Sequence, residues 1–460
     1  MTGTERVLAR LDASFDDAEK RWLDWLRIPS VSADPAHAPD IRRAAEYAVA
    51  QLADLGFTAS VRETAGAPCV VAHHPGPGGD APHLLYYGHY DVQPAEPLDL
   101  WKNPPFEPTV VEGPHGPRVV ARGSVDDKGQ VAMWLAAFRA WHAESGSLPC
   151  RVSVLLEGEE EISSPNLKPF VSANRDELAA DAVVISDTNM WDVATPALTT
   201  SLRGIVYIQV DVKAANRDLH SGMYGGSALN PINALVAALG QLKDETGRIR
   251  IEGFYDGVRE VPPEQKRQWE ALKFDEARLL GDIGLTTGAG EAGYSALERL
   301  WARPTCDING VWGGYQGPGS KTVIPAAAGA KVSFRLVEGQ DAEKVIAGFE
   351  RFLRARMPRD ARLDFTVFGS GTGVAFSTSD RFVQAAAAAL KVEYGREAAF
   401  VGCGASIPVV ETLQAELHAP VVLMGFGLDD DQPHSPNEKF EVCCFRHGAR
   451  AHVRLLGLLG

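Results

Sequence analysis

Four short apolar runs in this 460-residue chain each lead to residues that can bind a metal ion. His89 follows 84–88, Glu160 and Glu161 follow 152–158, Asp187 follows 182–186, and His434 comes ten residues after 421–424. Apolar runs of this length, bounded by turn residues, are typical of buried strands. Ligands bind at the carboxyl ends of the strands in open α/β sheets. The sequence therefore predicts a metal site at one edge of a sheet.

Strand and helix patterns alternate in two separate stretches of the chain. Helices are expected over 41–55, 129–143, 166–179, 380–394 and 406–415, and strands over 60–72, 84–88, 151–156, 182–186 and 420–424. Such alternation indicates an α/β layer structure. We predict one discontinuous catalytic, metal-binding domain made of residues 1–198 and 372–460, with a mixed sheet that has helices on both sides.

The stretch between these two parts has a different pattern. Residues 204–212, 330–337 and 362–368 alternate apolar with polar side chains, as in a sheet with one solvated face. Helices are expected after Pro231 and over 341–356. This order predicts an inserted α+β, ferredoxin-like domain at 199–371. Segment 243–303 is charged, with scattered Gly and Pro, and its pattern predicts no particular element.

Composition and charge exclude several classes of protein. The chain is 45% hydrophobic and 23% charged, with a net charge of −15, so it should repel nucleic acid phosphates. No run reaches the roughly 18–20 apolar residues that cross a bilayer, and the N-terminal stretch has no signal-peptide core. The six cysteines form no C-x-x-C pair and suit reduced thiols. We therefore expect a cytoplasmic protein that binds neither nucleic acid nor membrane.

Each candidate metal ligand also has a plain structural alternative. His89 and Asp91 lie two residues apart, as a ligand and its orienting carboxylate do, but they also fit a hydrogen-bonded loop pair. Asp126 precedes a helix, where an aspartate is a common cap. The three glutamates 159–161 suit a solvated turn, and His434 suits an exposed loop.

Taken together, these residues favour a site with two metals. Imidazole and carboxylate ligands without thiolate suit Zn²⁺, Mn²⁺ or Co²⁺. Two divalent cations would balance the carboxylates of Asp126, Glu161 and Asp187. Such a pair can polarise a carbonyl group and lower the pKa of a shared water, and a nearby carboxylate that is not a ligand can take its proton.

The motifs that carry these residues resemble those of the M20 family of metallopeptidases, in particular its cytosolic dipeptidase (carnosinase-like) branch. In the order of that family the chain has GHYDVQP at 88, RGSVDDKGQ at 122, EGEEE at 157, ISD at 185, DLHSG at 218, KTVIP at 321, FRLV at 334, GASIP at 404 and HSPNEK at 434. Each motif alone is weak. Nine in the same order, spanning most of the chain from residue 88, are specific.

The resemblance implies a zinc-peptidase-like catalytic domain and a role for each residue of the site. The implied metal ligands are His89, Asp126 and Asp187 for one ion, and Asp126, Glu161 and His434 for the other. Asp91 would orient His89, and Glu160 would be the general base. The peptide bond between Asp126 and Asp127 is cis in such enzymes.

The inserted domain of the resembled family acts as a lid and forms a homodimer. By resemblance, His220 would stabilise the oxyanion in a neighbouring subunit, and Arg335 would pair with the substrate carboxylate. Thr322, Ser406 and Gly404 would line the substrate pocket. Read from the residues alone, His220 also fits an ordinary turn, and Arg335 fits an ordinary strand charge.

These observations lead to one hypothesis and two alternatives. The hypothesis is a dinuclear metal-dependent hydrolase, with Zn²⁺ as the first choice, that cleaves the amide bond of dipeptides or short peptides. A water shared by the two metals attacks, and Glu160 accepts its proton. One alternative is an N-acyl amino acid deacylase on the same scaffold. The other is a metal-binding protein without catalysis, against which a spare base such as Glu160 argues.

Overall fold

The computed structural model describes residues 3–460 and divides them into two compact units. The first unit comprises the residues up to Thr200 together with Phe376–Val401 and Pro408–Gly460. The second comprises Ser201–Ala375 and Gly402–Ile407. The expected boundaries of 199 and 371 lie close to this division. The short segment Gly402–Ile407, expected in the first domain, belongs to the second unit.

The first unit is built on a mixed sheet whose strands lie in the order β1-β2-β6-β3-β7-β17-β8. Their bounds are β1 Thr58–Arg62, β2 Cys69–His74, β3 His83–His89, β6 Arg151–Glu157, β7 Ala182–Ile185, β8 Ala197–Leu202 and β17 Val421–Leu423. The four neighbours β6, β3, β7 and β17 run parallel to one another. These are the four apolar runs of the sequence, so their carboxyl ends meet at one edge of the sheet.

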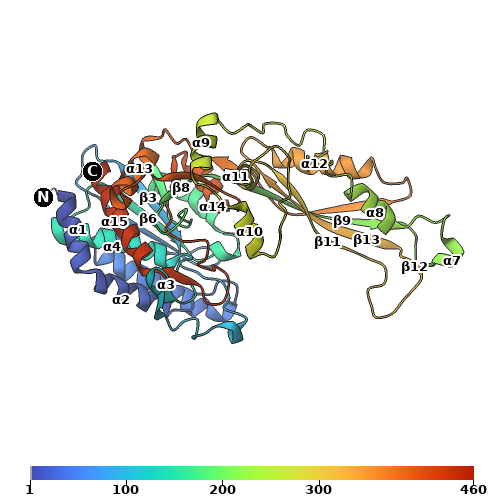
Figure 1. Ribbon diagram of the computed structural model, residues 1–460. Helices are drawn as coiled ribbons and strands as arrows, with labels where there is room; N and C mark the ends of the chain where they lie inside the picture. The colour runs from blue at the N-terminus through green and yellow to red at the C-terminus, as the bar shows by residue number, and fades with distance from the viewer. Residues whose placement is uncertain (1–2) are drawn as a thin grey trace. The chain divides into compact units, whose positions relative to one another are not determined.

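Helices cover both faces of this sheet, as the sequence predicts (Figure 1). On one face, Tyr86 packs its ring against Trp134 and Phe138 of α4 (Lys128–Ser145). Alternate residues of a strand point to opposite faces, and on the other face His73 of β2 contacts Glu177 of α6 (Arg175–Leu178). Helix α4 is apolar almost all round because α15 (Val442–Leu459) also packs on it.

The second unit contains an antiparallel sheet in the order β11-β13-β9-β14. In the chain the elements follow as β9 Gly204–Lys213, α8 Pro231–Leu239, β11 Thr305–Gly313, β13 Ala327–Leu336, α12 Ala342–Arg354 and β14 Arg362–Gly371. This is the βαββαβ order of a ferredoxin-like fold. Buried and half-buried residues alternate along β9, and Val206, Ile208 and Val210 lie in a core with residues of α8 and α12. The fold prediction is therefore confirmed.

Strand β11 is the element that the sequence pattern did not reveal. Its pairing with β13 shifts register between Ile308 and Gly310, so the apolar–polar alternation is broken there. The preceding segment holds the short helices α9 Pro263–Ala271, α10 Glu276–Asp282 and α11 Ala296–Trp301. Arg303, which is 4% exposed, pairs with Glu291 and lies over the ring of Tyr294. Charged and aromatic contacts of this kind stabilise the segment in place of an amphipathic repeat.

The remaining elements complete the two units. A small sheet has the order β18-β5-β4, with β4 Thr109–Gly113, β5 Gly116–Val120 and β18 Lys439–Glu441. The others are α1 Gly3–Ala13, α2 Phe15–Leu26, η1 Pro35–His37, α3 Ala38–Ala53, η2 Leu98–Leu100, η3 Glu160–Ile162, α5 Leu167–Ala173, β10 Leu219–His220, α7 Ser221–Tyr224, β12 Val323–Ile324, β15 Val374–Ala375, α13 Arg381–Tyr394, β16 Ala399–Cys403 and α14 Pro408–Leu417.

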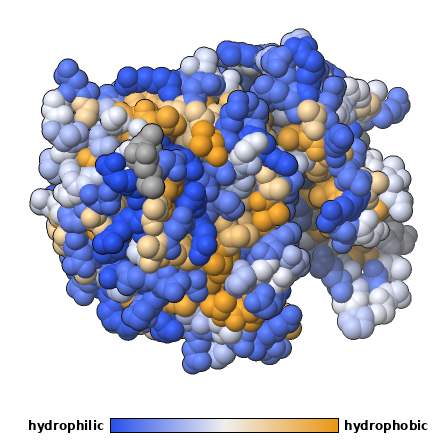
Figure 2. Space-filling view, turned by 60° about the vertical axis from the view of Figure 1, so that its left-hand side comes forward, coloured by the Kyte–Doolittle hydropathy of each residue, from blue (hydrophilic) through white to orange (hydrophobic). Residues whose placement is uncertain are grey.

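Within residues 3–460, no helix has the length and hydropathy of a membrane span. On the face in Figure 2, hydrophobic residues are interspersed with hydrophilic ones.

Candidate metal centre

The five expected metal ligands come together at the carboxyl edge of the parallel strands. His89 ends β3, and Asp187 comes two residues after β7. Glu161 lies in the turn η3, just after β6, while Asp126 and His434 come from loops. Their ligand atoms form two groups, His89–Asp126–Asp187 and Asp126–Glu161–His434, each with all atoms within 4.8 Å of one another. Whether metal ions bind to these groups stays a prediction.

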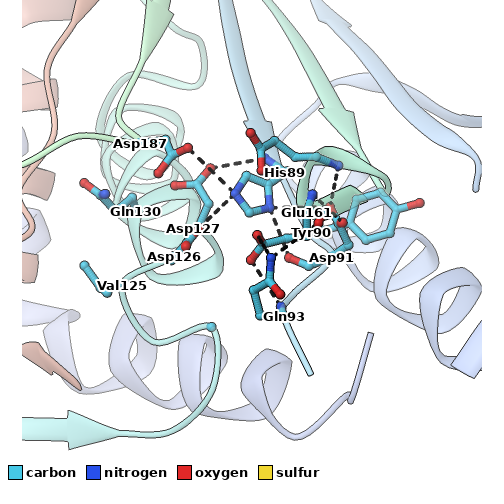
Figure 3. A network of polar contacts seen from close by, with 12 residues as sticks. His89, Tyr90, Asp91, Gln93, Val125, Asp126, Asp127, Gln130, Glu161 and Asp187 are labelled. Carbon is cyan, nitrogen blue, oxygen red and sulfur yellow. Dashed lines mark hydrogen bonds and ion pairs between the residues drawn. The ribbon is translucent and has the colours of Figure 1, made fainter. Parts of the chain in front are cut away.

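His89 presents a bare ring nitrogen to two carboxylates. Its Nδ1 lies 3.0 Å from the carbonyl oxygen of Asp91 and 3.4 Å from the Oδ1 of the same residue. Because both oxygens only accept hydrogen bonds, a neutral ring would carry its proton on Nδ1 and turn the lone pair of Nε2 toward the carboxylates. In the metal-free protein burial lowers the pKa of His89, but the contacts with Asp126 and Asp91 outweigh burial and raise that pKa well above its ordinary value. Nε2 is buried without a hydrogen-bond partner, although Asp126 Oδ1 lies 3.0 Å and Asp187 Oδ2 3.8 Å away (Figure 3). A proton relieves this crowding in the metal-free protein, and a cation could take its place.

Asp126 joins the two groups through its two carboxylate oxygens. Oδ1 faces His89, and Oδ2 lies 2.9 Å from the Nε2 of His434. The same Nε2 lies 3.3 Å from Glu161 Oε2, so it too faces only acceptors. Burial alone would raise the pKa of Asp126, but the contacts with His434 and His89 hold it below its usual range. The carboxylate is therefore ionised and offers one oxygen to each group.

The electrostatics of the cluster fit a pair of divalent cations. Burial, helped by the charge of Asp126, raises the pKa of Glu161 to about 10 and that of Asp187 to about 6. The contact with Asp126 raises the pKa of His434. Without cations these groups hold protons, because buried negative charges repel one another. Cations would take the place of those protons, and the nitrogen and oxygen donors suit Zn²⁺, Mn²⁺ or Co²⁺.

Beside the two groups lies the carboxylate of Glu160, which is engaged in no other interaction among the described residues. Within residues 3–460 its side chain takes part in no hydrogen bond or ion pair, whereas its backbone N–H donates to Asp91 Oδ1 at 3.2 Å. Burial raises the pKa of Glu160 to about 7; His89 opposes this shift, and Asp187 adds to it. A carboxyl group with a pKa near neutrality can both accept and release a proton at physiological pH.

Asp91 does more than the sequence suggests. The nearer contact of the His89 ring is the backbone carbonyl oxygen of Asp91, not its carboxylate. The carboxylate accepts hydrogen bonds from the backbone N–H groups of Glu160, at 3.2 Å, and Glu161, at 3.1 Å. Asp91 therefore orients the histidine and also holds the turn that carries the candidate base and a candidate ligand.

Two further residues hold ligands in place and were missed by the sequence analysis. Gln93 donates from its side chain to Glu161 Oε2 at 2.8 Å and from its backbone to Oε1 at 3.1 Å. Glu438 is fully buried and accepts bonds from Arg122 and from the backbone N–H groups of Gly123, Val125 and Asp126. Glu438 thus ties the loop of His434 to the loop of Asp126. Both residues lie in quoted motifs, but only the fold reveals their partners.

The other expected site residues lie in the second unit. Arg335, on β13, donates from Nη1 to Ser406 Oγ at 3.0 Å, and the carbonyl oxygen of Gly404 accepts from Arg203. His220 is exposed, and its Nδ1 accepts from the N–H of Gly222 at 3.0 Å. The exposed Thr322 accepts from the N–H of Ser221 through its carbonyl oxygen. The roles of all these residues stay predictions.

One feature implied by the resemblance is present in the backbone. The peptide bond between Asp126 and Asp127 is cis, as expected. The carboxylate of Asp127 turns inward and accepts from the backbone N–H of His89 at 3.1 Å. Adjacent aspartates thus have different tasks: Asp126 faces the two histidines through its side chain, and Asp127 holds the end of β3.

Comparison with known proteins agrees with this geometry. The family model described as peptidase family M20/M25/M40 matches residues 85–457. The chain belongs to peptidase family M20. Among its relatives, the Cys-Gly metallodipeptidase dug1 of Schizosaccharomyces pombe is 31% identical over 97% of this chain and 96% of the relative. The human Beta-Ala-His dipeptidase is also 31% identical, over 97% of this chain and 90% of the relative.

Solved structures of M20 members have the same fold over nearly the whole chain. The Dug1p dipeptidase of Saccharomyces cerevisiae superposes with a TM-score of 0.80 at 28% identity and covers 100% of this chain and 99% of that one. The metallo-carboxypeptidase Sso-CP2 of Sulfolobus solfataricus superposes with a TM-score of 0.81 at 29% identity, over 96% of this chain and 99% of that one. The two-unit architecture is therefore that of M20 peptidases.

The raised carboxyl pKa values predict how metal removal affects stability. An acid whose pKa is raised by folding stabilises the fold only while it is protonated, so this contribution is lost as pH rises through about 6 for Asp187, 7 for Glu160 and 10 for Glu161. The raised pKa of His434 acts in the same direction. We expect the Tm of the chelator-treated protein to fall between pH 5.5 and pH 8. Added Zn²⁺ should raise Tm more at pH 8, as measured by differential scanning fluorimetry.

Glu161→Gln serves as the matched variant for this experiment. It removes the carboxyl group with the highest of these pKa values, so the fall in Tm of the metal-free protein with pH should become shallower. An equal gain in Tm from Zn²⁺ at both pH values in the unaltered protein would contradict the metal centre.

The contacts of Glu438 predict that its substitution weakens metal binding, although Glu438 is not itself a candidate ligand. Glu438→Gln keeps the shape of the side chain but removes the charge that holds four donors around the Asp126 loop. Loss of a residue that orients ligands typically weakens metal affinity by about 10–100-fold. Titration of Zn²⁺ into the metal-free variant measures this change. Glu441→Gln alters another fully buried carboxylate, which pairs with Lys439 at 3.2 Å and does not contact the Asp126 loop, and this variant should bind metal normally.

Proposed function

We propose that this M20 member is a dinuclear metal-dependent hydrolase that cleaves the amide bond of dipeptides or short peptides. The observation that carries the proposal is Glu160, a carboxylate beside two groups of candidate metal ligands whose side chain takes part in no hydrogen bond or ion pair within residues 3–460. A protein that only stores or senses metal needs no such spare base. The named relatives act as dipeptidases on Cys-Gly and Beta-Ala-His, which supports a dipeptide substrate.

Two divalent cations complete the proposed site. His89, Asp126 and Asp187 would hold one ion, and Asp126, Glu161 and His434 the other. Zn²⁺ is the first choice, and Mn²⁺ or Co²⁺ are alternatives because they also bind imidazole and carboxylate ligands. When bound, the cations would polarise the scissile carbonyl group and lower the pKa of water toward neutrality.

The protein's own groups move the proton and hold the substrate. We propose that the Glu160 carboxylate accepts the proton of the attacking water and then passes it to the leaving amine. The Nδ1 of His220 accepts from Gly222, so a neutral ring carries its proton on Nε2 and can donate to a developing oxyanion. Arg335 would bind the terminal carboxylate of the substrate. Thr322, Ser406 and Gly404 would line the pocket.

Substrate turnover tests this function directly. The metal-loaded protein should hydrolyse members of a dipeptide panel faster than the corresponding N-acetyl amino acids. Glu160→Gln should lower kcat by about 10²–10⁴-fold, the usual contribution of a general base. Its metal content, measured by elemental analysis, should stay at two ions per chain.

The neighbouring Glu159→Gln is the control for this substitution. Glu159 accepts from the backbone N–H of Ala67 and from Asn166, so glutamine there should leave turnover close to normal. Preferred cleavage of the N-acetyl panel would favour a deacylase on the same scaffold. No hydrolysis of either panel by the loaded protein would contradict the hydrolase.

We also propose that the protein forms a homodimer through the second unit. Strand β11 is an edge of the four-stranded sheet, and its Ile308 and Val311 are 46% and 47% exposed. Val236 of α8 is 52% exposed. Apolar side chains along a free sheet edge are typical of a surface that pairs with another chain.

Sedimentation velocity tests the dimer. The unaltered protein should sediment with twice the mass of one chain. Val311→Lys places a charge on the exposed edge and should shift the protein toward the monomer. Arg278→Ala, which removes an exposed charge of α10 outside the sheet, should not. A monomeric unaltered protein would contradict the proposal.

A cytoplasmic location is proposed on the state of the thiols. Within residues 3–460 no cysteine forms a disulfide bond, and four of the six cysteines are buried. Thiols that do not form disulfides are typical of a reducing compartment.

A further inference from the structure

Two arginines of the second unit lie side by side without an acidic partner. Arg335 pairs in register with Ile205 on the neighbouring strand, and Arg203 lies two residues before Ile205. Residues two apart in an extended chain point to the same face, so the two arginines are diagonal neighbours on one face of the sheet. That face is the half-buried one, since Val206 and Phe334, the alternate residues, lie in the core.

No carboxylate of the second unit balances these two charges. Among residues 3–460, neither guanidinium group forms an ion pair with an aspartate or glutamate. The thiol of Cys403 and, after it, the carboxylate of Asp307 act to raise the pKa of Arg203, and that carboxylate lies 3.8 Å from the ammonium group of Lys243. Burial, and next the charge of Arg335, lowers the pKa of Arg203 to about 10. Two like charges placed together at a half-buried site are unfavourable unless an anion binds between them.

The segment Gly402–Ile407 holds both side chains in position. Arg203 donates from Nε to the carbonyl oxygen of Gly404 at 2.9 Å, and Arg335 donates from Nη1 to Ser406 Oγ at 3.0 Å. Ser406 in turn donates to the carbonyl oxygen of Arg203 at 2.5 Å. A Cβ at position 404 would lie 2.9 Å from Arg203 Nη2, so a larger residue there would displace the guanidinium group. The two forks are thus oriented before any ligand arrives.

These contacts leave other N–H groups of both arginines available. Nε of Arg203 and Nη1 of Arg335 are engaged with the segment, while Nη1 and Nη2 of Arg203 and Nε and Nη2 of Arg335 have no hydrogen bond within the described chain. Neither arginine has a nitrogen that is both fully buried and without a partner, so these groups are open to a ligand. Planar forks of this kind match the two oxygens of a carboxylate.

We propose that Arg203 acts with Arg335 to bind the free terminal carboxylate of the substrate, and that Arg203 is a specificity-determining residue. This proposal rests on the proposed hydrolase function, which supplies the cleavage of the amide bond. It adds Arg203 as a second arginine to the contact with the substrate carboxylate that the family resemblance implies for Arg335. A peptide whose C-terminus is an uncharged amide lacks the group that the pair recognises.

A dipeptide and its C-terminal amide distinguish this role from a structural one. The unaltered protein should cleave the dipeptide with a much lower KM than the amide. In Arg203→Met, the KM for the dipeptide should rise about 10–100-fold, as for loss of a charged hydrogen bond. Its kcat for the dipeptide and its KM for the amide should change little. Arg203→Lys keeps the positive charge but not the planar guanidinium group, and should bind the dipeptide more tightly than Arg203→Met does.

The matched control is Arg356→Met, which removes another half-buried arginine of the same unit that donates to Gln241 and to the carbonyl oxygen of Phe352. It should leave the difference between dipeptide and amide unchanged. If Arg203→Met fails to fold, the Arg203→Lys variant carries the test through its ratio of dipeptide to amide KM. Equal losses for dipeptide and amide in the Arg203 variants would overturn the proposal.

Calorimetric titration separates this proposal from the proposed function. The dipeptide and its amide are titrated into metal-free protein, where no turnover occurs. Tighter binding of the dipeptide, lost in Arg203→Met, supports the two-arginine site even if the loaded protein hydrolyses neither compound. Equal binding of the two compounds to the unaltered protein overturns the site, while hydrolysis of the dipeptide would still stand as evidence for the enzyme.

Discussion

The contact between the bare Nε2 of His89 and the carboxylates of Asp126 and Asp187 is the constraint on which the metal centre depends. The oxygens around Nδ1 keep a proton there, so a neutral ring turns the lone pair of Nε2 toward the acids, and without metal the contact with Asp126 raises the pKa of His89 well above its ordinary value. A buried array of acceptors is unfavourable by itself. Protons relieve it in the metal-free protein, and two cations would relieve it in the working enzyme. The raised pKa of Glu160 follows from the same crowding of burial and negative charge.

Much of the fold serves to hold this unfavourable array together. Parallel strands bring His89, Glu161 and Asp187 to one edge, and three polar residues then hold the loops: Asp91 the turn of Glu160, Gln93 the side chain of Glu161, and Glu438 the loop of Asp126. Most of these contacts are hydrogen bonds to backbone N–H groups. Because the bonded groups belong to the backbone, these contacts hold the loops in position whatever side chains the loops carry.

Each unit contains a local excess of charge, and the two excesses have opposite sign. The first unit gathers carboxylates, whose negative charge favours cations. The second places Arg203 beside Arg335 without an ion-paired acid, and this positive charge favours an anion. The net charge of −15 hides this division, because the local balance of a few buried groups decides binding.

By itself, the sequence determined the strands that matter, their place in an α/β layer with a mixed sheet and the five candidate ligands, because apolar runs followed by His, Glu or Asp are local signals. It also indicated the ferredoxin-like insertion through the alternation along β9, β13 and β14. Only the tertiary structure decided the rest. Strand β11 lacks alternation because of its bulge, and Glu438 meets Asp126 across 312 residues of chain. Arg203 and Arg335 become neighbours only through antiparallel pairing. Such contacts depend on how distant segments pack, and no local pattern of residues encodes that packing.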